Sequence, residues 1–260
     1  MRRGILRDDL PALAGLLVPA LWLAGQDSWF APRLLFCVGL VLAWQLVFAL
    51  VRGQGMGLHG MVSGVLIALF VPAAAPFWQL AIGISFGLVL GEAVFGGRGR
   101  NFVQPVVLTL AFLAFSFADQ PWRDGVELPL TSALPALGLL VVTGQVRLPI
   151  LLGLAVSIVA LALPIAPDLL KPGPASGALL LALLFLTADP VTSGATPAGR
   201  ILNGLLAGAL MVLFSTGGPA FGALVFATLL ASIFTPLIDH MVTAVHTWLM
   251  QRRARRLRNV

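Results

Sequence analysis

The chain alternates between long apolar runs and short polar breaks, and ten apolar runs can be counted along its 260 residues. They lie at about residues 10–25, 31–51, 59–73, 77–95, 102–118, 132–145, 147–165, 175–187, 200–214 and 219–249. A transmembrane helix needs about 20 apolar residues, and the runs at 59–73, 132–145, 175–187 and 200–214 fall short of that length. The pattern predicts an all-α polytopic membrane protein with ten transmembrane helices, several of them short or broken.

The composition supports this interpretation and excludes soluble enzymes. Hydrophobic residues make up 59% of the chain and charged residues 10%, whereas a soluble domain carries about 25% charged residues. The single cysteine, Cys37, excludes a disulfide framework and a Cys-based iron–sulfur or zinc site within this chain. The net charge of +6 is spread over the ends of the runs, so it indicates contact with the lipid bilayer and no nucleic acid. Because many runs follow the first, we expect residues 10–25 to be an uncleaved helix.

The basic residues predict an orientation. If both termini are cytoplasmic and all ten runs cross the membrane, 13 of the 16 Lys and Arg residues lie inside, which is the usual bias. The outer loops then hold Arg33, Arg123 and Lys171, together with Asp27, Asp119, Asp124, Glu127 and Asp168. This arrangement puts the loop after residue 187 on the cytoplasmic side. A re-entrant segment at 175–187 would put it on the other side, and both arrangements remain open.

An internal similarity predicts two repeats. Ser63–Phe70, "SGVLIALF", resembles Ser176–Phe185, "SGALLLALLF", and a proline-containing break and a Gly-rich apolar run follow each. The two pieces are five runs apart, and an odd offset inverts the second copy relative to the first. We therefore expect one membrane domain over residues 1–260, with inverted five-helix repeats at about 10–118 and 132–249 and a basic tail at 250–260.

The first break with candidate chemistry is Phe95–Pro105, "FGGRGRNFVQP". Gly96 and Gly97 allow backbone N–H groups to approach a ligand closely. Arg98 and Arg100 can hold a phosphate or a lipid headgroup, and Asn101 offers donors and an acceptor. The alternative is an ordinary inside loop with positive residues, since a Gly-rich loop is a weak phosphate signal.

The second break is Thr187–Arg200, "TADPVTSGATPAGR". Asp189, just before Pro190, is either a functional ionisable group at the membrane or the cap of a turn. The run Ser193–Thr196 is a small turn with two hydroxyls, suited to modification by another enzyme or to cupping a phosphate with backbone N–H groups. The residue types alone leave open which hydroxyl matters.

Other polar residues point to no metal site. Glu92 lies in an apolar run and would need a partner or water. His59, His240 and His246 lie near the ends of runs, where interfacial or helix-capping roles are expected. No HExxH, CxxC or carboxylate-pair pattern is present.

Three segments together resemble one family. "ADPVTSGATPAGRILNGLLAGAL" (Ala188–Leu210) resembles the flavin-attachment segment of RnfD and NqrB. These are membrane subunits of the Rnf ferredoxin:NAD oxidoreductase and of the sodium-pumping NADH:quinone oxidoreductase. "VFGGRGRNFVQPVVLTLAFL" (Val94–Leu113) is similar to the Gly-Gly-x-Gly-x-Asn segment of that family, although its usual Asn-Pro is Gln104-Pro105 here. "GALVFATLLASIFTPLIDHMV" (Gly222–Val242) resembles the last helix, with Pro-Leu-Ile-Asp ending at Asp239.

The resemblance implies a ten-span subunit that carries FMN covalently, through its phosphate, on a threonine. The matching acceptor is Thr196, and the matching motif residues are Ser193, Gly194, Ala195, Asp189 and Pro190. Gly96, Gly97 and Asn101 match the Gly-rich segment, which would lie near a flavin, and Arg98 or Arg100 would stabilise the reduced, anionic flavin. The resemblance also leaves room for a second, non-covalent flavin.

The function implied is that of a membrane subunit of an ion-coupled electron transport complex of the Rnf or Nqr type. Such a subunit relays electrons between redox partners in the bacterial inner membrane. Its partners would be other membrane subunits of the complex and a flavin transferase. Two alternatives are a small-solute channel or transporter with the same repeats and no flavin, and a structural scaffold that tolerates changes in both breaks.

Overall fold

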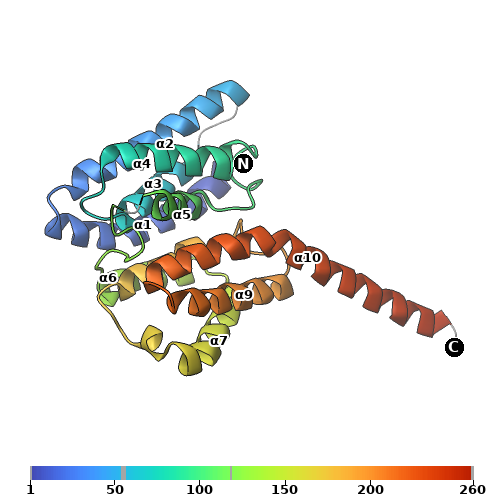
Figure 1. Cartoon of the computed structure of the whole chain (residues 1–260). Coiled ribbons are helices and arrows are strands. Elements are labelled where there is room, and N and C mark those ends of the chain that lie inside the picture. Colours follow the sequence, from blue (N-terminus) through green and yellow to red (C-terminus); the bar gives the residue numbers. More distant parts are fainter. Residues whose placement is uncertain (1, 54–56, 118, 259–260) are drawn as a thin grey trace.

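The structure is a computed structural model that describes residues 2–53, 57–117 and 119–258, with side chains between residues 9 and 252. These residues form ten α-helices, joined by loops and by three short helical segments of other types (Figure 1). The α-helices are α1 (Arg2–Gln26), α2 (Phe30–Arg52), α3 (His59–Phe70), α4 (Phe77–Leu88), α5 (Pro105–Ser116), α6 (Leu130–Val142), α7 (Leu148–Ile165), α8 (Ser176–Ala182), α9 (Pro197–Ser215) and α10 (Ala220–Arg258). The short segments are the π-helical η1 (Val89–Ala93), the 3-10 helix η2 (Pro167–Leu170) and the π-helical η3 (Leu183–Thr187).

Every predicted apolar run contains a helix, but only half of the helices have the length of a full span. By length and composition, five can cross a membrane: Asp9–Gln26, Phe30–Arg52, Leu148–Ile165, Pro197–Ser215 and Ala220–Arg252. Five others are apolar but have only 10–17 residues: His59–Phe70, Phe77–Ala93, Pro105–Ser116, Leu130–Val142 and Ser176–Thr187. The described part of the chain is therefore a multi-pass arrangement of five long and five short apolar helices.

Two predicted lengths were wrong, and proline explains both. The run at 200–214 belongs to a helix of 19 residues, because Thr196 and Pro197 begin α9 earlier than the apolar run does. The run at 102–118 contains a helix of only 12 residues, because α5 begins at Pro105 and the residues before it form a loop. Residue 118, and the last two residues of the predicted basic tail, lie outside the described residues.

The helices form two groups, α1–α5 and α6–α10, that lie side by side (Figure 1). Helix pairs recur with an offset of five helices. Within the first group α1 packs on α3, α2 on α4, and α5 on α3 and α4; within the second α6 packs on α8, α7 on α9, and α10 on α8 and α9. Between the groups, α1 packs on α6 and α5 on α10.

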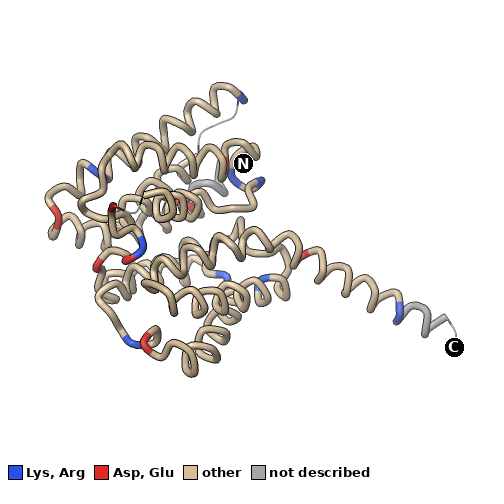
Figure 2. The backbone as a smooth tube through the Cα atoms, in the orientation of Figure 1, with Lys and Arg blue, Asp and Glu red and all other residues tan. Residues whose placement is uncertain are grey.

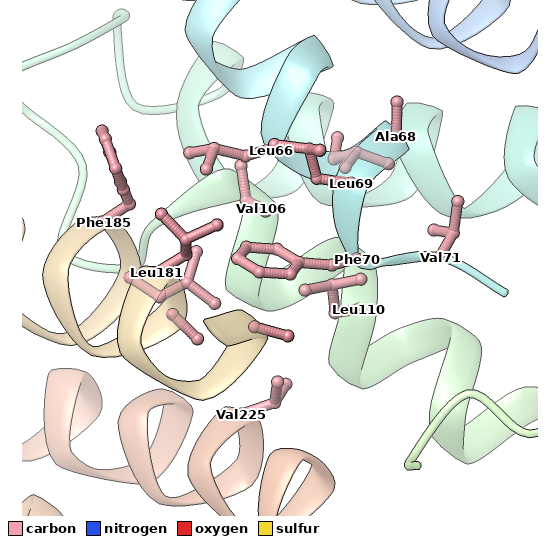
Figure 3. Close-up of a cluster of buried hydrophobic side chains, with 14 of the residues drawn as sticks. Leu66, Ala68, Leu69, Phe70, Val71, Val106, Leu110, Leu181, Phe185 and Val225 are labelled. Atoms are coloured by element: carbon pink, nitrogen blue, oxygen red, sulfur yellow. The ribbon is translucent and has the colours of Figure 1, made fainter. Parts of the chain in front are cut away.

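The core lies where short helices from both groups meet. Phe70 at the end of α3 points toward Leu181 of α8 and Leu110 of α5, with Val225 of α10 beneath (Figure 3). These four side chains are buried, and the Phe70 ring lies 5.3 Å from the ring of Phe221. The short helices are thus held by apolar packing in the interior.

Glycines allow α7 and α9 to approach closely. A Cβ atom on Gly153 would lie 2.2 Å from the carbonyl oxygen of Ile201, and one on Gly204 would lie 2.1 Å from that of Ile150. Small residues at such crossings are typical of helices that pack in a membrane.

The N-terminal end of α1 and the C-terminal end of α10 lie toward the same end of the helices, and α10 projects well beyond its neighbours (Figure 1). The loops at the opposite end, which join α1 to α2, α5 to α6 and α7 to α8, carry acidic positions (Figure 2). The chain ends and these loops therefore have the relative placement that the charge pattern predicts.

Candidate functional site

The two predicted breaks share an unusual local structure. Each begins directly after a π-helical turn, in which Val94 N–H donates to Val89 O (2.8 Å) and Ala188 N–H donates to Leu183 O (3.0 Å). Each ends at a side chain that caps the next helix, followed by a proline at the first helical position: Thr196 caps α9, and the corresponding cap of α5 is described below. Isolated π-helical turns occur frequently at functional sites.

Gln104 connects the two breaks. Its Oε1 accepts a hydrogen bond from Val107 N–H (3.0 Å), which caps α5, and its Nε2 donates to Phe185 O of η3 (3.2 Å). The charge of Arg98 in the first break also acts on the carboxylate of Asp189 in the second. The structure therefore brings together the two segments that stand out in the sequence.

The glycine-rich loop, residues 94–104, depends on glycine geometry. Gly96, Gly97 and Gly99 have φ angles of +106°, +95° and +92°, a region that other residues adopt only at a cost. Asn101 is 7% exposed and bonds within the loop: its Oδ1 accepts from Gly99 N–H (3.1 Å) and its Nδ2 donates to Val103 O (3.0 Å). The Asn101 side chain thus stabilises the loop, while the backbone at Gly97 faces open space.

The two arginines of this loop differ. Arg98 Nη1 lies 3.3 Å from Asp9 Oδ1 and also donates to His59 Nδ1. The ring proton of His59 is then on Nε2, which lies 3.6 Å from Glu92 Oε2. The carboxylates of Asp9 and Glu92, 5% and 7% exposed, therefore share one cationic neighbourhood.

Arg100 has no such partners among the described residues, and its exposed side chain lies against Gly96. Of the two predicted flavin-facing arginines, Arg100 is the one whose charge is not already engaged. The partner that Glu92 needed is His59. Nothing in the sequence indicated that Asp9 would complete the cluster, because α1 is remote from this loop in the chain.

The second loop, residues 188–196, is a chain of turns. Asp189 Oδ2 accepts a hydrogen bond from Thr192 Oγ1 (3.2 Å), and Asp189 O accepts one from Ser193 N–H (3.0 Å). Burial raises the pKa of the Asp189 carboxyl, while Arg98 and hydrogen bonds from Thr192 oppose the rise. Asp189 therefore makes the turn-capping contacts that were one of its two predicted roles, and Pro190 after it is exposed.

The four hydroxyl groups of the second break differ in access. Thr187, Thr192 and Ser193 are 5%, 6% and 4% exposed. Thr187 is bonded to Thr228 (2.7 Å), whereas Ser193 Oγ has no hydrogen-bond partner among the described residues. Thr196 is half-buried, and Ala195 and Pro197 on either side of it are exposed. Among these hydroxyls, that of Thr196 is the one at the surface.

Thr196 occupies the N-cap of α9. Its Oγ1 accepts a hydrogen bond from Gly199 N–H (3.0 Å), so it lies at the helix end that favours negative charge. Arg200 Nε donates to Gly194 O (2.8 Å) and holds the turn against the first turn of the helix. The site residues predicted in this loop are therefore contiguous in space.

Sequence reasoning did not assign a role to Asp239 of α10, although it noted the position. Asp239 Oδ2 accepts a hydrogen bond from Ala195 N–H (2.7 Å), and the Thr196 hydroxyl donates to Asp239 Oδ1 (3.4 Å). The signal in the sequence is a carboxylate three residues after Pro236, at the end of an apolar run. No group of three or more His, Cys, Asp or Glu that could hold a metal ion occurs in the described residues.

Comparison with known sequences decides the family. The profile of the NQR2, RnfD, RnfE family matches residues 4–135 and 128–247. The chain belongs to this family. Both candidate loops lie within the residues matched to the NQR2, RnfD, RnfE profile, the glycine-rich loop in the first match and the hydroxyl loop in the second.

Relatives in the NQR2, RnfD, RnfE family include a subunit of the Na(+)-translocating NADH-quinone reductase of Pseudomonas aeruginosa, which is 30% identical over 89% of this chain and 72% of its own length. The subunit of the same name from Azotobacter vinelandii is 29% identical with the same coverage. The one from Chromohalobacter salexigens is 27% identical over 88% of this chain and 68% of its own length.

Proposed function

We propose that the chain is a membrane subunit of an electron transport complex and that it carries FMN on Thr196 through a phosphoester bond. The names of the relatives support the first part, since they are subunits of an NADH-quinone reductase. One observation carries the second part: of the four hydroxyls in residues 187–196, three are buried and that of Thr196 reaches the surface. A modifying enzyme needs such access.

The residues present fit a phosphate-linked flavin. A phosphate on Thr196 would lie at the N-terminus of α9, where free backbone N–H groups and the helix dipole stabilise an anion. The buried Ser193 Oγ next to it lacks a hydrogen-bond partner among the described residues, as expected of a group reserved for a ligand. Arg200 in the first turn of α9 adds a positive charge to the same region.

The glycine-rich loop would supply the non-covalent contacts. Backbone N–H groups near Gly97 and the exposed guanidinium of Arg100 would bind the flavin, and the Arg100 charge would favour its reduced, anionic form. Gln104 fixes the distance between this loop and the hydroxyl loop through Phe185. When bound, FMN can exchange electrons singly or in pairs, and a covalent link keeps it at a fixed distance from its partners. A second, non-covalent flavin would need the same loop.

The fold proposal completes this assignment. We infer that α1–α5 and α6–α10 are inverted repeats, supported by the recurring helix pairs and by the meeting of α1 with α6 and α5 with α10. We further propose ten crossings of a bacterial inner membrane, with both termini cytoplasmic, other membrane subunits as electron partners, and a flavin transferase for maturation.

The test is in-gel fluorescence after denaturation. Wild type, Thr192→Ala, Ser193→Ala and Thr196→Ala are each co-expressed with a flavin transferase. We expect a fluorescent band for the wild type and for the Thr192 and Ser193 variants, and none for Thr196→Ala. A wild type without fluorescence, with the transferase active on another substrate, would contradict the proposal. So would a Thr196→Ala band as bright as the wild type.

A further inference from the structure

We infer that Asp239 is a positioning residue that presents the Thr196 hydroxyl for flavin attachment and holds the unmodified loop against α10. This inference rests on the proposed function, since it concerns the same hydroxyl. It adds a residue from another helix, 43 positions further along the chain, to the attachment site.

The first argument is that both oxygens of the Asp239 carboxylate bind the acceptor turn. Oδ2 accepts the Ala195 N–H at 2.7 Å, and Oδ1 receives the Thr196 hydroxyl at 3.4 Å. The short bond is a charge-assisted one to the backbone, which fixes the residue next to the acceptor. The carboxylate therefore fixes both the turn and the hydroxyl that the turn carries.

The second argument concerns the orientation of the hydroxyl. A threonine hydroxyl has one proton and two lone pairs. The proton is directed to Asp239, and one lone pair accepts the Gly199 N–H at 3.0 Å. One lone pair remains, and it is the one that a phosphorus atom can approach. The two partners thus leave a single direction of attack.

The attachment step itself is a phosphoryl-group transfer from FAD. A bond forms between Thr196 Oγ1 and the phosphorus of the FMN half of FAD, and the bond from that phosphorus to the oxygen of the AMP half breaks. AMP leaves and takes up the proton that the hydroxyl loses, so no oxidant or reductant is consumed. Asp239 acts on this step only through the placement of the hydroxyl.

The third argument is the fit of the glycines around the carboxylate. A Cβ atom on Gly199 would lie 2.3 Å from Asp239 Oδ1 and 2.8 Å from Thr196 Oγ1, and one on Gly194 would lie 3.2 Å from Asp239 Oδ1. Any larger residue at position 199 would push the carboxylate away from the hydroxyl. The close contact at Gly199 is therefore explained by the seat of Asp239.

The same geometry predicts what happens after attachment. The phosphoester oxygen has no proton to donate, so the hydrogen bond to Asp239 is lost, and the phosphate places a second negative charge beside the carboxylate. Two like charges at this distance repel each other. The modified loop should therefore be held less tightly against α10 than the unmodified loop, and the Ala195 amide should exchange its hydrogen faster.

The test measures the rate of attachment on the purified, full-length, unmodified chain. It is incubated in detergent with a flavin transferase and FAD, and the covalent fluorescence is followed over time at several chain concentrations. The variants are Asp239→Ala, Asp239→Asn and Gly199→Ala. The control is His240→Asn, which changes the next, exposed residue of the same helix.

We expect Asp239→Ala and Gly199→Ala to lower kcat for attachment about ten- to a hundredfold, as misplaced reacting groups do, with KM for the chain little changed. Asp239→Asn should be intermediate, because an amide oxygen can accept the Ala195 N–H but the amide nitrogen cannot accept the hydroxyl proton. His240→Asn should match the wild type.

The outcomes separate this inference from the proposed function. If the wild type and Asp239→Ala are modified at the same rate while Thr196→Ala is not modified, the role of Asp239 is wrong and the flavin assignment stands. If the wild type is not modified, the flavin assignment fails. Should Asp239→Ala fold poorly, the isosteric Asp239→Asn and the Gly199→Ala variant still decide, and wild-type rates in both would overturn the inference.

Discussion

The glycine-rich loop at residues 94–104 and the hydroxyl loop at residues 188–196 share a construction but differ in what anchors them. Both follow a π-helical turn and end at a capping side chain and a proline. The first contains three glycines with positive φ and is tied by Arg98 to α1 and α3. In the second, no described residue has a positive φ, and Asp239 ties it to α10.

The difference shows how one architecture can serve two chemical tasks. The first loop presents backbone N–H groups and an exposed guanidinium, which suit reversible contact with a ligand. The second presents one accessible hydroxyl at a helix N-terminus, which suits a covalent bond to a phosphate. Because the anchors lie on different helices, each loop can be disturbed without the other.

Arg98→Gln should have the largest effect on stability, and it should act on the first loop only. The change leaves the buried carboxylates of Asp9 and Glu92 without their cation, which costs roughly 2–3 kcal/mol. Thermal unfolding in detergent measures the loss, and in-gel fluorescence should show normal attachment at Thr196. Arg100→Gln is the matched control, because its side chain is exposed. Equal melting temperatures for the two variants would refute the role of Arg98 as an anchor.

Gln104→Leu should have the next largest effect and should weaken the link between the loops. It removes the cap of α5 and leaves Phe185 O unpaired in the interior, at a cost of about 2 kcal/mol. Hydrogen exchange should then become faster in residues 183–188 as well as at Val107. The control is Gln26→Leu, at an exposed position at the end of α1. If exchange in residues 183–188 stays at the wild-type rate, the two loops are not coupled through this side chain.

Gly97→Ala should have the smallest effect, because only the backbone conformation opposes it. The added methyl group meets open space, so the cost is the positive φ alone, about 1 kcal/mol. Gly194→Ala sharpens the comparison, since that position has no positive φ but its Cβ would lie 3.1 Å from Gly199 C. We expect Gly194→Ala to slow attachment at Thr196 and Gly97→Ala to leave it unchanged. The reverse result would show that the loops have exchanged roles.

Much of the fold follows from the sequence because apolar runs identify membrane helices. All ten runs contain helices, and the charge pattern agrees with the relative placement of the termini. Helix ends were less accurate, since Pro105 and Pro197 and their caps determine them more than hydropathy does. The π-helical turns have no signature in composition, so they were not predicted.

The candidate site was predicted in part for a related reason. Both loops stand out in the sequence, because their Gly, Pro, Ser and Thr residues interrupt apolar runs. Their partners do not stand out: Asp9 is 89 residues from Arg98, and Asp239 is 43 residues from Thr196. A single sequence does not say which helices are neighbours, so ion pairs and hydrogen bonds between distant helices require the structure.

The measurement that tests the central claim most directly is the mass of the tryptic peptide that ends at Arg200. It is taken from chain co-expressed with a flavin transferase and fragmented to locate the modification. We predict an added mass of FMN less one water, located on Thr196. An unmodified peptide from protein matured with an active transferase, or a flavin located on Thr192 or Ser193, would contradict the assignment.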